Sequence, residues 1–370
     1  MNKTMGPTLQ SKTIGQCLFT LALCFAFFGT VMVFSASAFL DENSSFSFFF
    51  RQCAWVLLGM IALWVASRAD YSHLLRMKWV WVGIALVLLA CVLWSPFRVC
   101  TKRGLVCRWV AFGPLKIQPS ELSKYAIIIF LAGIFGRRQE QVRQLFRGVV
   151  PPIAIVGVLV GLIFLEPDRS MSVFVALSAF VLWILSGARK LHFIPAAVFG
   201  VVLFFFLVKD SATAQRRWRA YLEQDDCRSD AGFQVCQSKI GLANGGVVGQ
   251  GPGRGRQKLG YLPEPHTDFI FSVVGEELGF LGCAATLFGF AVYVWLGFCV
   301  ARRATDLQAT LLAAGITFVV GVQALINISV ATGVVPPTGI ALPFISYGGS
   351  SMVSSMGATG VLVNIARSIR

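Results

Sequence analysis

The sequence predicts an all-α integral membrane protein with many spans. Of its 370 residues, 56% are hydrophobic and only 13% are charged, which is typical of a membrane protein rather than of a soluble domain. Apolar runs of roughly 20 residues, the length needed to cross the hydrocarbon core, recur along the chain. No polar stretch is long enough to fold as a separate soluble domain, so we expect a single membrane domain over residues 1–370.

Ten apolar runs are candidate spans. They cover about residues 14–38, 46–66, 79–96, 119–136, 149–165, 170–187, 191–208, 269–300, 308–332 and 343–366. The eighth run is too long for one simple crossing. We therefore expect that its first turns lie at the interface, or that the helix bends near Gly275, Gly279 or Gly282.

The distribution of positive charge predicts the orientation. With a cytoplasmic N-terminus, the short inner segments hold many Lys and Arg, whereas the short outer loops 39–45 and 333–342 hold none. This obeys the positive-inside rule, and an even number of spans places both termini in the cytoplasm. Two longer outer loops, about 97–118 and 209–267, are also basic, and the second separates helices seven and eight.

The net charge of +15 is explained by this topology and does not indicate a nucleic-acid partner. A basic surface just outside the bilayer suits an anionic lipid head group such as a phosphate or pyrophosphate. The alternative is contact with ordinary anionic membrane lipid.

Four of the ten cysteines form two close pairs, Cys100 with Cys107 and Cys227 with Cys236. Both pairs lie in the predicted outer loops, where an oxidising exterior makes each a candidate local disulfide, although spacing does not show whether the geometry fits. A metal site is less favoured, because the spacings are not CxxC and the only histidine in either loop is His266. The other six cysteines lie in apolar runs, where Cys is usually a small buried hydrophobe.

The stretch RWVAFGPLKIQPSELSK, residues 108–124, combines a helix start with buried charge. Pro119 begins the helix, and Glu121 follows in its first turn. Lys124, one turn into a span, is costly unless it reaches the surface or faces a polar cavity. Glu121 and Lys124 are also i,i+3 neighbours that can pair.

Two further clusters follow in predicted outer loops. In EPDRS, residues 166–170, Asp168 either caps the next helix or acts directly in a site. The glycine-rich segment 241–258 lacks Walker spacing and follows no strand, which excludes a nucleotide-binding P-loop. Its backbone N–H groups, near Lys258, are instead suited to cradling a phosphate.

The stretch YLPEPHTDFIF, residues 261–271, places Glu264, His266 and Asp268 where water gives way to lipid. His266 alone is more typical of a structural residue, and Asp268 or Thr267 can serve as a helix cap. A partly desolvated carboxylate near basic groups is, however, a suitable general base. Further on, Glu276 and Glu277 enter the predicted membrane region, where acids usually face a cavity or a partner.

Taken together, these blocks resemble the SEDS family, the polytopic proteins of shape, elongation, division and sporulation. The blocks that carry the resemblance are RWVAFGPLKIQPSELSK, EPD, RQKLGYLPEPHTDFIFSVVGEELG, QALINI and LPFISYGGSS, in the family's order. The stretch RQKLGYLPE looks more like the cell-division branch, FtsW, than the elongation branch, RodA. The family's PDxGT reads here as PDRSM, and EQDDCRSDAGFQVC replaces its DPxxDPxGxGYQ region, which leaves any transferred role for Asp168 and residues 223–236 in doubt.

The resemblance implies a peptidoglycan glycosyltransferase with ten membrane helices in the bacterial cytoplasmic membrane. It implies lipid II as substrate, a class B penicillin-binding protein transpeptidase as partner, and other divisome proteins nearby. The family's essential aspartate falls on Asp268, its loop arginine on Arg108, and its PSExxK acid and lysine on Glu121 and Lys124. We expect these last three, with Glu264, His266 and Lys258, to bind the substrate, and a divalent cation, Mg²⁺ or Mn²⁺, to be an optional cofactor.

Two other functions compete with this interpretation. A flippase that moves lipid II between leaflets is kept open by Glu276 and Glu277, although polar groups at one face argue against alternating access near the midplane. A scaffold that holds divisome partners without chemistry predicts that substitutions at Asp268 leave function intact.

Overall fold

The chain folds as a mostly helical, multi-pass membrane protein. The computed structural model describes residues 7–37, 42–94, 98–100, 107–112, 115–137, 142, 144–188, 193–194, 198, 200, 212–223, 225–227, 232–259, 262 and 264–369. Within these ranges, five helical segments are long and apolar enough to cross a membrane: Ser11–Ser37, Phe46–Arg68, Phe146–Leu165, Ile270–Arg303 and Leu307–Ala331. Two shorter apolar helices are Lys78–Trp94 and Arg169–Leu185. The predicted span 191–208 falls almost entirely outside the described residues.

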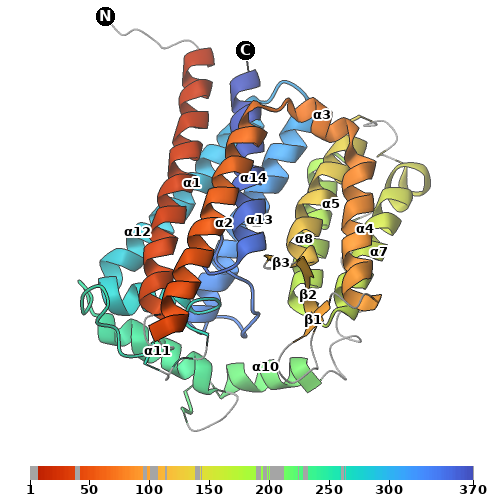
Figure 1. Ribbon diagram of the computed structural model, residues 1–370. Coiled ribbons are helices and arrows are strands. Elements are labelled where there is room, and N and C mark those ends of the chain that lie inside the picture. The colour runs from red at the N-terminus through yellow and green to blue at the C-terminus, as the bar shows by residue number, and fades with distance from the viewer. Residues whose placement is uncertain are drawn as a thin grey trace, which may run out of the picture.

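Nine helices form the body of the described bundle. They are α1 (Pro7–Ser37), α2 (Glu42–Arg68), α4 (Lys78–Trp94), α5 (Pro119–Phe135), α7 (Val150–Leu165), α8 (Arg169–Leu185), α12 (Ile270–Arg303), α13 (Leu307–Ala331) and α14 (Gly349–Ser368). In Figure 1, α1, α2, α12 and α14 lie on one side and α4, α5, α7 and α8 on the other, and α13 packs against members of both groups. The start of α1 and the end of α14 lie at the same end of the bundle (Figure 1).

Short elements cover the two ends. They are α3 (Tyr71–Arg76), the π-helical turn η1 (Leu145–Val149), α10 (Ala212–Leu222), α11 (Phe233–Gly245), and strands β1 (Arg98–Cys100), β2 (Cys107–Phe112) and β3 (Leu115–Ile117). The strands form an antiparallel sheet of order β1-β2-β3, in which Val110 pairs with both Arg98 and Ile117. The sequence predicts only a loop here, at about residues 97–118. The aromatic and β-branched residues of β2 favour a strand.

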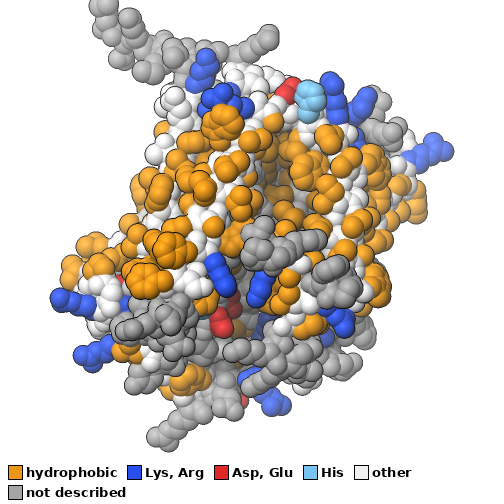
Figure 2. All heavy atoms as spheres, viewed as in Figure 1, with side chains coloured by type: hydrophobic (Ala, Val, Ile, Leu, Met, Phe, Trp, Pro, Cys, Tyr) orange, Lys and Arg blue, Asp and Glu red, His pale blue; other side chains and the backbone are white. Residues whose placement is uncertain are grey.

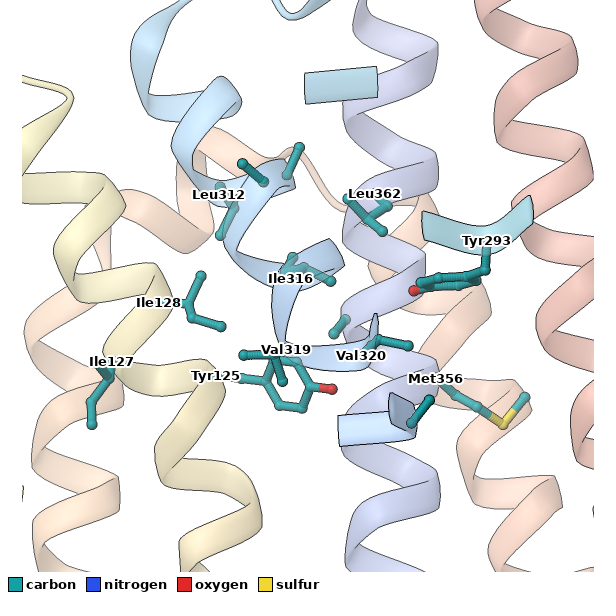
Figure 3. Packing of buried hydrophobic residues seen from close by; sticks show 14 of the residues in the cluster. Tyr125, Ile127, Ile128, Tyr293, Leu312, Ile316, Val319, Val320, Met356 and Leu362 are labelled. Atoms are coloured by element: carbon teal, nitrogen blue, oxygen red, sulfur yellow. The ribbon is translucent and has the colours of Figure 1, made fainter. Parts of the chain in front are cut away.

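The core lies where α5, α12, α13 and α14 meet. Figure 3 shows the aromatic rings of Tyr125 and Tyr293 and the aliphatic side chains of Ile128, Ile316 and Leu362 converging from these four helices. On the side facing α2, a Cβ at Gly360 of α14 would lie 2.5 Å from the carbonyl oxygen of Leu63. Small residues allow this close approach, which drives helix association in lipid.

The long helix α12 is broken at Gly279, whose φ of 67° and ψ of −163° are not helical. Glycine is the residue that adopts such a backbone without strain. Of the two expectations for this run, the bend is the one observed.

The last predicted span, 343–366, begins too early. α14 starts only at Gly349, because residues 343–348 fold as turns in which Ser346 donates its backbone N–H to the carbonyl of Leu342 and Phe344 has a positive φ of 65°. These turns lie beside residues 266–268 and shape the site described next.

Candidate active site

Arg108 and Asp168 come together at the end of the bundle that carries α10 and the sheet. Arg108, on β2, lies with one guanidinium nitrogen 3.7 Å from Asp168 and donates a hydrogen bond to the carbonyl of Pro167. Asp168 occupies the N-cap position of α8, and its other carboxylate oxygen accepts from the side chain of Gln118 at 3.1 Å. Burial raises the pKa of Asp168, and the charge of Arg108 opposes that shift. Asp168 therefore belongs to the group of polar side chains at this end of the bundle, with Arg108 and Gln118.

Asp268 is held by hydrogen bonds to the backbone around it. Its carbonyl accepts from the amide of Asn327 at 3.0 Å, and the same amide nitrogen donates to the carbonyl of Ile340 at 2.9 Å. The carbonyl of Thr267 accepts from the hydroxyl of Ser346 at 2.7 Å. These contacts fix the backbone of Asp268, just before α12 begins, against the loop between α13 and α14.

The environment of Asp268 favours its neutral form. Burial, and then the charge of Glu264, raise the pKa of Asp268 to about 6, while Arg217 and Arg108 oppose this. A carboxyl group with this pKa is mostly ionised at pH 7, yet it takes up a proton more readily than an ordinary aspartate, as a general base must.

Arg217 is the residue that sequence reasoning missed. It lies on α10 and donates to the hydroxyl of Ser170. A Cβ at Gly339 would lie 3.7 Å from Oδ2 of Asp268 and 3.9 Å from Nη2 of Arg217, so both groups lie next to this glycine. Its sequence context, RRWR, marks only a basic helix, and no spacing rule separates this arginine from its neighbours.

His266 and Glu264 lie on the rim of the site. Nε2 of His266 is 3.5 Å from a carboxylate oxygen of Glu264, whose side chain is 71% exposed. The imidazole is buried between Phe48 and Tyr347, with ring centroids 4.9 and 5.5 Å away, and burial lowers the pKa of His266. Burial thus favours the neutral ring, and the backbone carbonyl of His266 accepts a hydrogen bond from the N–H of Tyr347 at 2.9 Å.

Glu121 and Lys124 form a fully buried pair on α5. The Lys124 ammonium lies 2.5 Å from Glu121 and 2.6 Å from the side-chain oxygen of Gln323 on α13. The amide nitrogen of Gln323 donates in turn to the carbonyl of Ala341 at 3.0 Å. Through Gln323 the pair is thus linked to the loop 333–348, and its charges are satisfied within the protein.

Lys258 does not join this cluster. Its ammonium lies 2.6 Å from Glu277 and 2.8 Å from the hydroxyl of Ser35, and its side chain is fully buried. Glu276 accepts from the backbone N–H groups of Arg256 and Gln257 at 2.8 and 3.1 Å. The glycine-rich loop therefore binds the two acids of α12, rather than leaving its N–H groups and Lys258 open for a phosphate.

A profile of the FtsW/RodA/SpoVE family, described as cell cycle proteins, matches residues 15–370. The chain belongs to this family. It is 36% identical over 349 residues to a probable peptidoglycan glycosyltransferase FtsW of Geobacter metallireducens, covering 94% of this chain and 92% of that protein. It is 37% identical over 347 residues to stage V sporulation protein E of Bacillus subtilis, covering 92% and 93%.

Solved structures agree with the family assignment. The chain matches one from a structure described as "Structural coordination of polymerization and crosslinking by a peptidoglycan synthase complex", with a TM-score of 0.78, 26% identity and coverage of 95% and 97%. It also matches the fold of RodA from Thermus thermophilus, with a TM-score of 0.69, 24% identity and coverage of 95% and 96%. The resemblance predicted from the sequence motifs is thereby confirmed.

This family member also carries a buried acid that the sequence analysis left aside. Glu166 is 1% exposed, and neither of its carboxylate oxygens has a hydrogen-bond partner in the described part of the chain. Burial, and then the charge of Asp168, raise the pKa of Glu166 to about 8. Glu166 is therefore a neutral carboxylic acid at pH 7, next to the Arg108–Asp168 pair.

Two disulfides are present near this end of the bundle. Cys100 on β1 is bonded to Cys107 on β2. Cys227, which follows α10, is bonded to Cys236 on α11. Within the described ranges, no three His, Cys, Asp or Glu side chains are grouped so as to hold a metal ion. Asp168 instead lies near the guanidinium group of Arg108, and Asp268 lies near that of Arg217.

Proposed function

We propose that this protein is a peptidoglycan glycosyltransferase that polymerises lipid II. The proposal is supported by relatives named as probable peptidoglycan glycosyltransferases, which are similar over nearly the full length of both chains. The observation that carries it is the environment of Asp268, a largely desolvated carboxylate whose raised pKa is opposed by the charges of Arg217 and Arg108, with Arg217 next to the same glycine, Gly339. A general base and cationic groups beside it are what glycosyl transfer to a hydroxyl, with an anionic leaving group, requires.

In this mechanism Asp268 takes the proton from the 4-hydroxyl of the acceptor's N-acetylglucosamine. The freed oxygen attacks C1 of the donor's N-acetylmuramic acid with inversion, and polyprenyl pyrophosphate leaves. Arg108 and Arg217, both close enough to Asp268 to influence its pKa, stabilise the negative charge that develops on the pyrophosphate. Lys124 contributes less directly than the sequence suggested, because Glu121 and Gln323 already satisfy it.

We further propose a ten-span topology with both termini in the cytoplasm and the site at the outer face of the bacterial cytoplasmic membrane. The pattern of inner Lys and Arg supports this orientation. The start of α1 and the end of α14 lie at the same end of the bundle (Figure 1), which agrees with both termini being on one side of the membrane. In this orientation Asp268 lies where the sugars of lipid II are exposed. A class B penicillin-binding protein is the proposed partner, because a related chain was solved in a peptidoglycan synthase complex.

The experiment is polymerisation of purified lipid II by the reconstituted protein, alone and with its cognate transpeptidase, with glycan length read on a gel. Asp268→Asn is expected to reduce turnover by roughly 10²–10⁴, the usual contribution of a general base. Asp225→Asn is the matched control, because Asp225 is an exposed carboxylate in the same outer region, 86% exposed and paired with Lys239. For the wild type, the rate should fall as pH drops through about 6, where Asp268 becomes protonated.

Near-normal polymer from a folded Asp268→Asn protein would remove Asp268 as the base. If neither protein makes polymer, even with the partner, the glycosyltransferase proposal fails. A leaflet-exchange assay with labelled lipid II would then test the flippase.

A further inference from the structure

A polar cavity lies at the opposite end of the bundle from Asp268. It has a volume of about 270 Å³ and lies between α1, α2 and α14, where Arg68, Arg367, Ser67, Thr20 and Gln16 contribute polar groups. Asp268 lies beside the start of α14, whereas Arg367 lies at its end, so the length of this helix, roughly 30 Å, separates them. The cavity is therefore independent of the proposed catalytic site.

Two arginines give this cavity a positive charge. The guanidinium of Arg68 lies over the ring of Trp64, 4.6 Å from its centroid. Arg367 donates one hydrogen bond to the carbonyl of Ser67 at 3.2 Å, which leaves most of its donors open. Among the described residues, none that lines the cavity is acidic, and neither arginine forms an ion pair. Nearby Asp70 caps α3 through Ser72 instead.

An exposed apolar strip runs from this cavity along α2. Leu57, Ile61 and Trp64 precede Arg68 at intervals of four, three and four residues, so they share one face of the helix. Their exposed fractions are 55%, 51% and 52%. On α1, Phe27 and Val31 continue the face of Thr20 toward the middle of the membrane and are equally exposed. The surface thus joins a cationic cavity to an apolar track that, from Leu57 to Arg68, is about 16 Å long at 1.5 Å per residue.

The same chemistry recurs at this end on the other side of the bundle. A smaller cavity of about 190 Å³ lies between α4 and α5 and is lined by Lys78, Arg137 and Trp79. Figure 2 shows Lys and Arg side chains at this end, bordering the broad hydrophobic band of the surface. Paired cations beside a tryptophan at the rim of an apolar surface suit the head-group region of a bilayer.

We propose that the cavity between α1, α2 and α14 binds the phosphodiester head group of an anionic phospholipid of the inner leaflet. Arg68 and Arg367 bind the phosphate oxygens, Thr20 and Gln16 contact the polar head, and the acyl chains lie along the apolar face of α1 and α2. A lipid is favoured over free phosphate because the apolar track begins at the cavity itself. Basic pockets between transmembrane helices are a recurrent way of binding such head groups.

The test compares lipid binding to the purified full-length protein in a neutral detergent, by native mass spectrometry and by the shift in unfolding temperature. The probes are phosphatidylglycerol, phosphatidylcholine and inorganic phosphate. The variant is Arg68→Gln with Arg367→Gln. The control, Arg76→Gln with Arg302→Gln, removes the same charge from exposed positions at the ends of α3 and α12. Phosphatidylglycerol should bind wild type and control alike and the variant roughly 30-fold more weakly, at about a factor of five for each arginine.

Several outcomes would overturn the proposal. Equal affinity of variant and control for phosphatidylglycerol would show that any binding is not at this cavity. A stabilisation by inorganic phosphate equal to that by phosphatidylglycerol would assign the cavity to a free anion. Equal binding of phosphatidylcholine would show that the arginines do not select charge. A cooperative thermal unfolding transition, already measured in this experiment, reports whether the variant is folded, and an unfolded variant is replaced by Arg68→Gln alone.

Discussion

Glu166→Gln should stabilise this protein, and the gain should depend on pH. The carboxyl group is buried without a partner among the described residues, and its pKa is raised from 4.5 to about 8. Between these values the unfolded chain has released the proton and the folded chain has kept it, so folding takes up one proton. The stability associated with Glu166 is therefore fully present below pH 4.5 and is lost as pH rises through about 8.

The size of the effect follows from the shift. Each pH unit between the two pKa values costs about 1.4 kcal/mol, and pH 7 lies 2.5 units above 4.5, which gives about 3 kcal/mol. A glutamine of the same shape does not titrate, so Glu166→Gln avoids this loss. At pH 7 to 8 the variant should unfold several degrees above the wild type, and at pH 4.5 the two should differ little.

Thermal unfolding of the detergent-solubilised protein, followed by tryptophan fluorescence at pH 4.5, 7 and 8.5, measures this. Asp225→Asn is again the control, because an exposed carboxylate should give no comparable pH-dependent gain. A difference between Glu166→Gln and wild type that is constant across the three pH values would refute the reasoning. So would a variant that is less stable than wild type at pH 8.5, since glutamine would then lack a contact that the carboxylate makes.

Two further predictions concern Arg217, which the sequence patterns did not single out, and Lys258, which they placed among the substrate-binding residues. Arg217→Gln should lower polymerisation of lipid II by roughly 100- to 1000-fold, as loss of one charge-stabilising group does. Arg216→Gln, on the exposed face of the same helix, should leave the rate within about twofold, and equal rates for the two variants would exclude Arg217 from the site. Lys258→Met should destabilise the fold by about 3–5 kcal/mol, because it leaves the buried carboxylate of Glu277 unpaired, and adding Glu277→Gln should recover most of that stability in thermal unfolding; no recovery would mean that the pair is not what Lys258 stabilises.

The residues of the site that the sequence could predict are those with a local signature. Asp268 is the last polar residue before an apolar helix, and Glu121 and Lys124 share one face at i,i+3 spacing. The structure places each of them where these rules suggest, and Glu121 and Lys124 are paired at 2.5 Å. A rule that acts within one turn of chain needs no knowledge of the tertiary fold.

Arg217 and Lys258 show where such rules end. Both are basic residues in the same predicted loop, 209–267, and nothing in the composition of the loop distinguishes their roles. Arg217 lies in the site because α10 packs close enough to Ser170 for the two side chains to form a hydrogen bond. Lys258 lies outside the site because the glycine-rich loop folds back onto α12. Both outcomes depend on contacts between segments distant in sequence, which periodicity and motif spacing do not encode.

The same contacts bear on the flippase alternative. That alternative rested on Glu276 and Glu277, two acids predicted to enter the membrane region and to face a cavity or a partner there. In the structure Glu276 accepts hydrogen bonds from two backbone N–H groups, and Glu277 pairs with Lys258 and accepts from Ser35 and Gly253. An acid that guides a polar head group across a bilayer must be able to exchange its partners. These two acids instead hold the loop against the broken helix at Gly279, so the feature that favoured transport is explained by the fold.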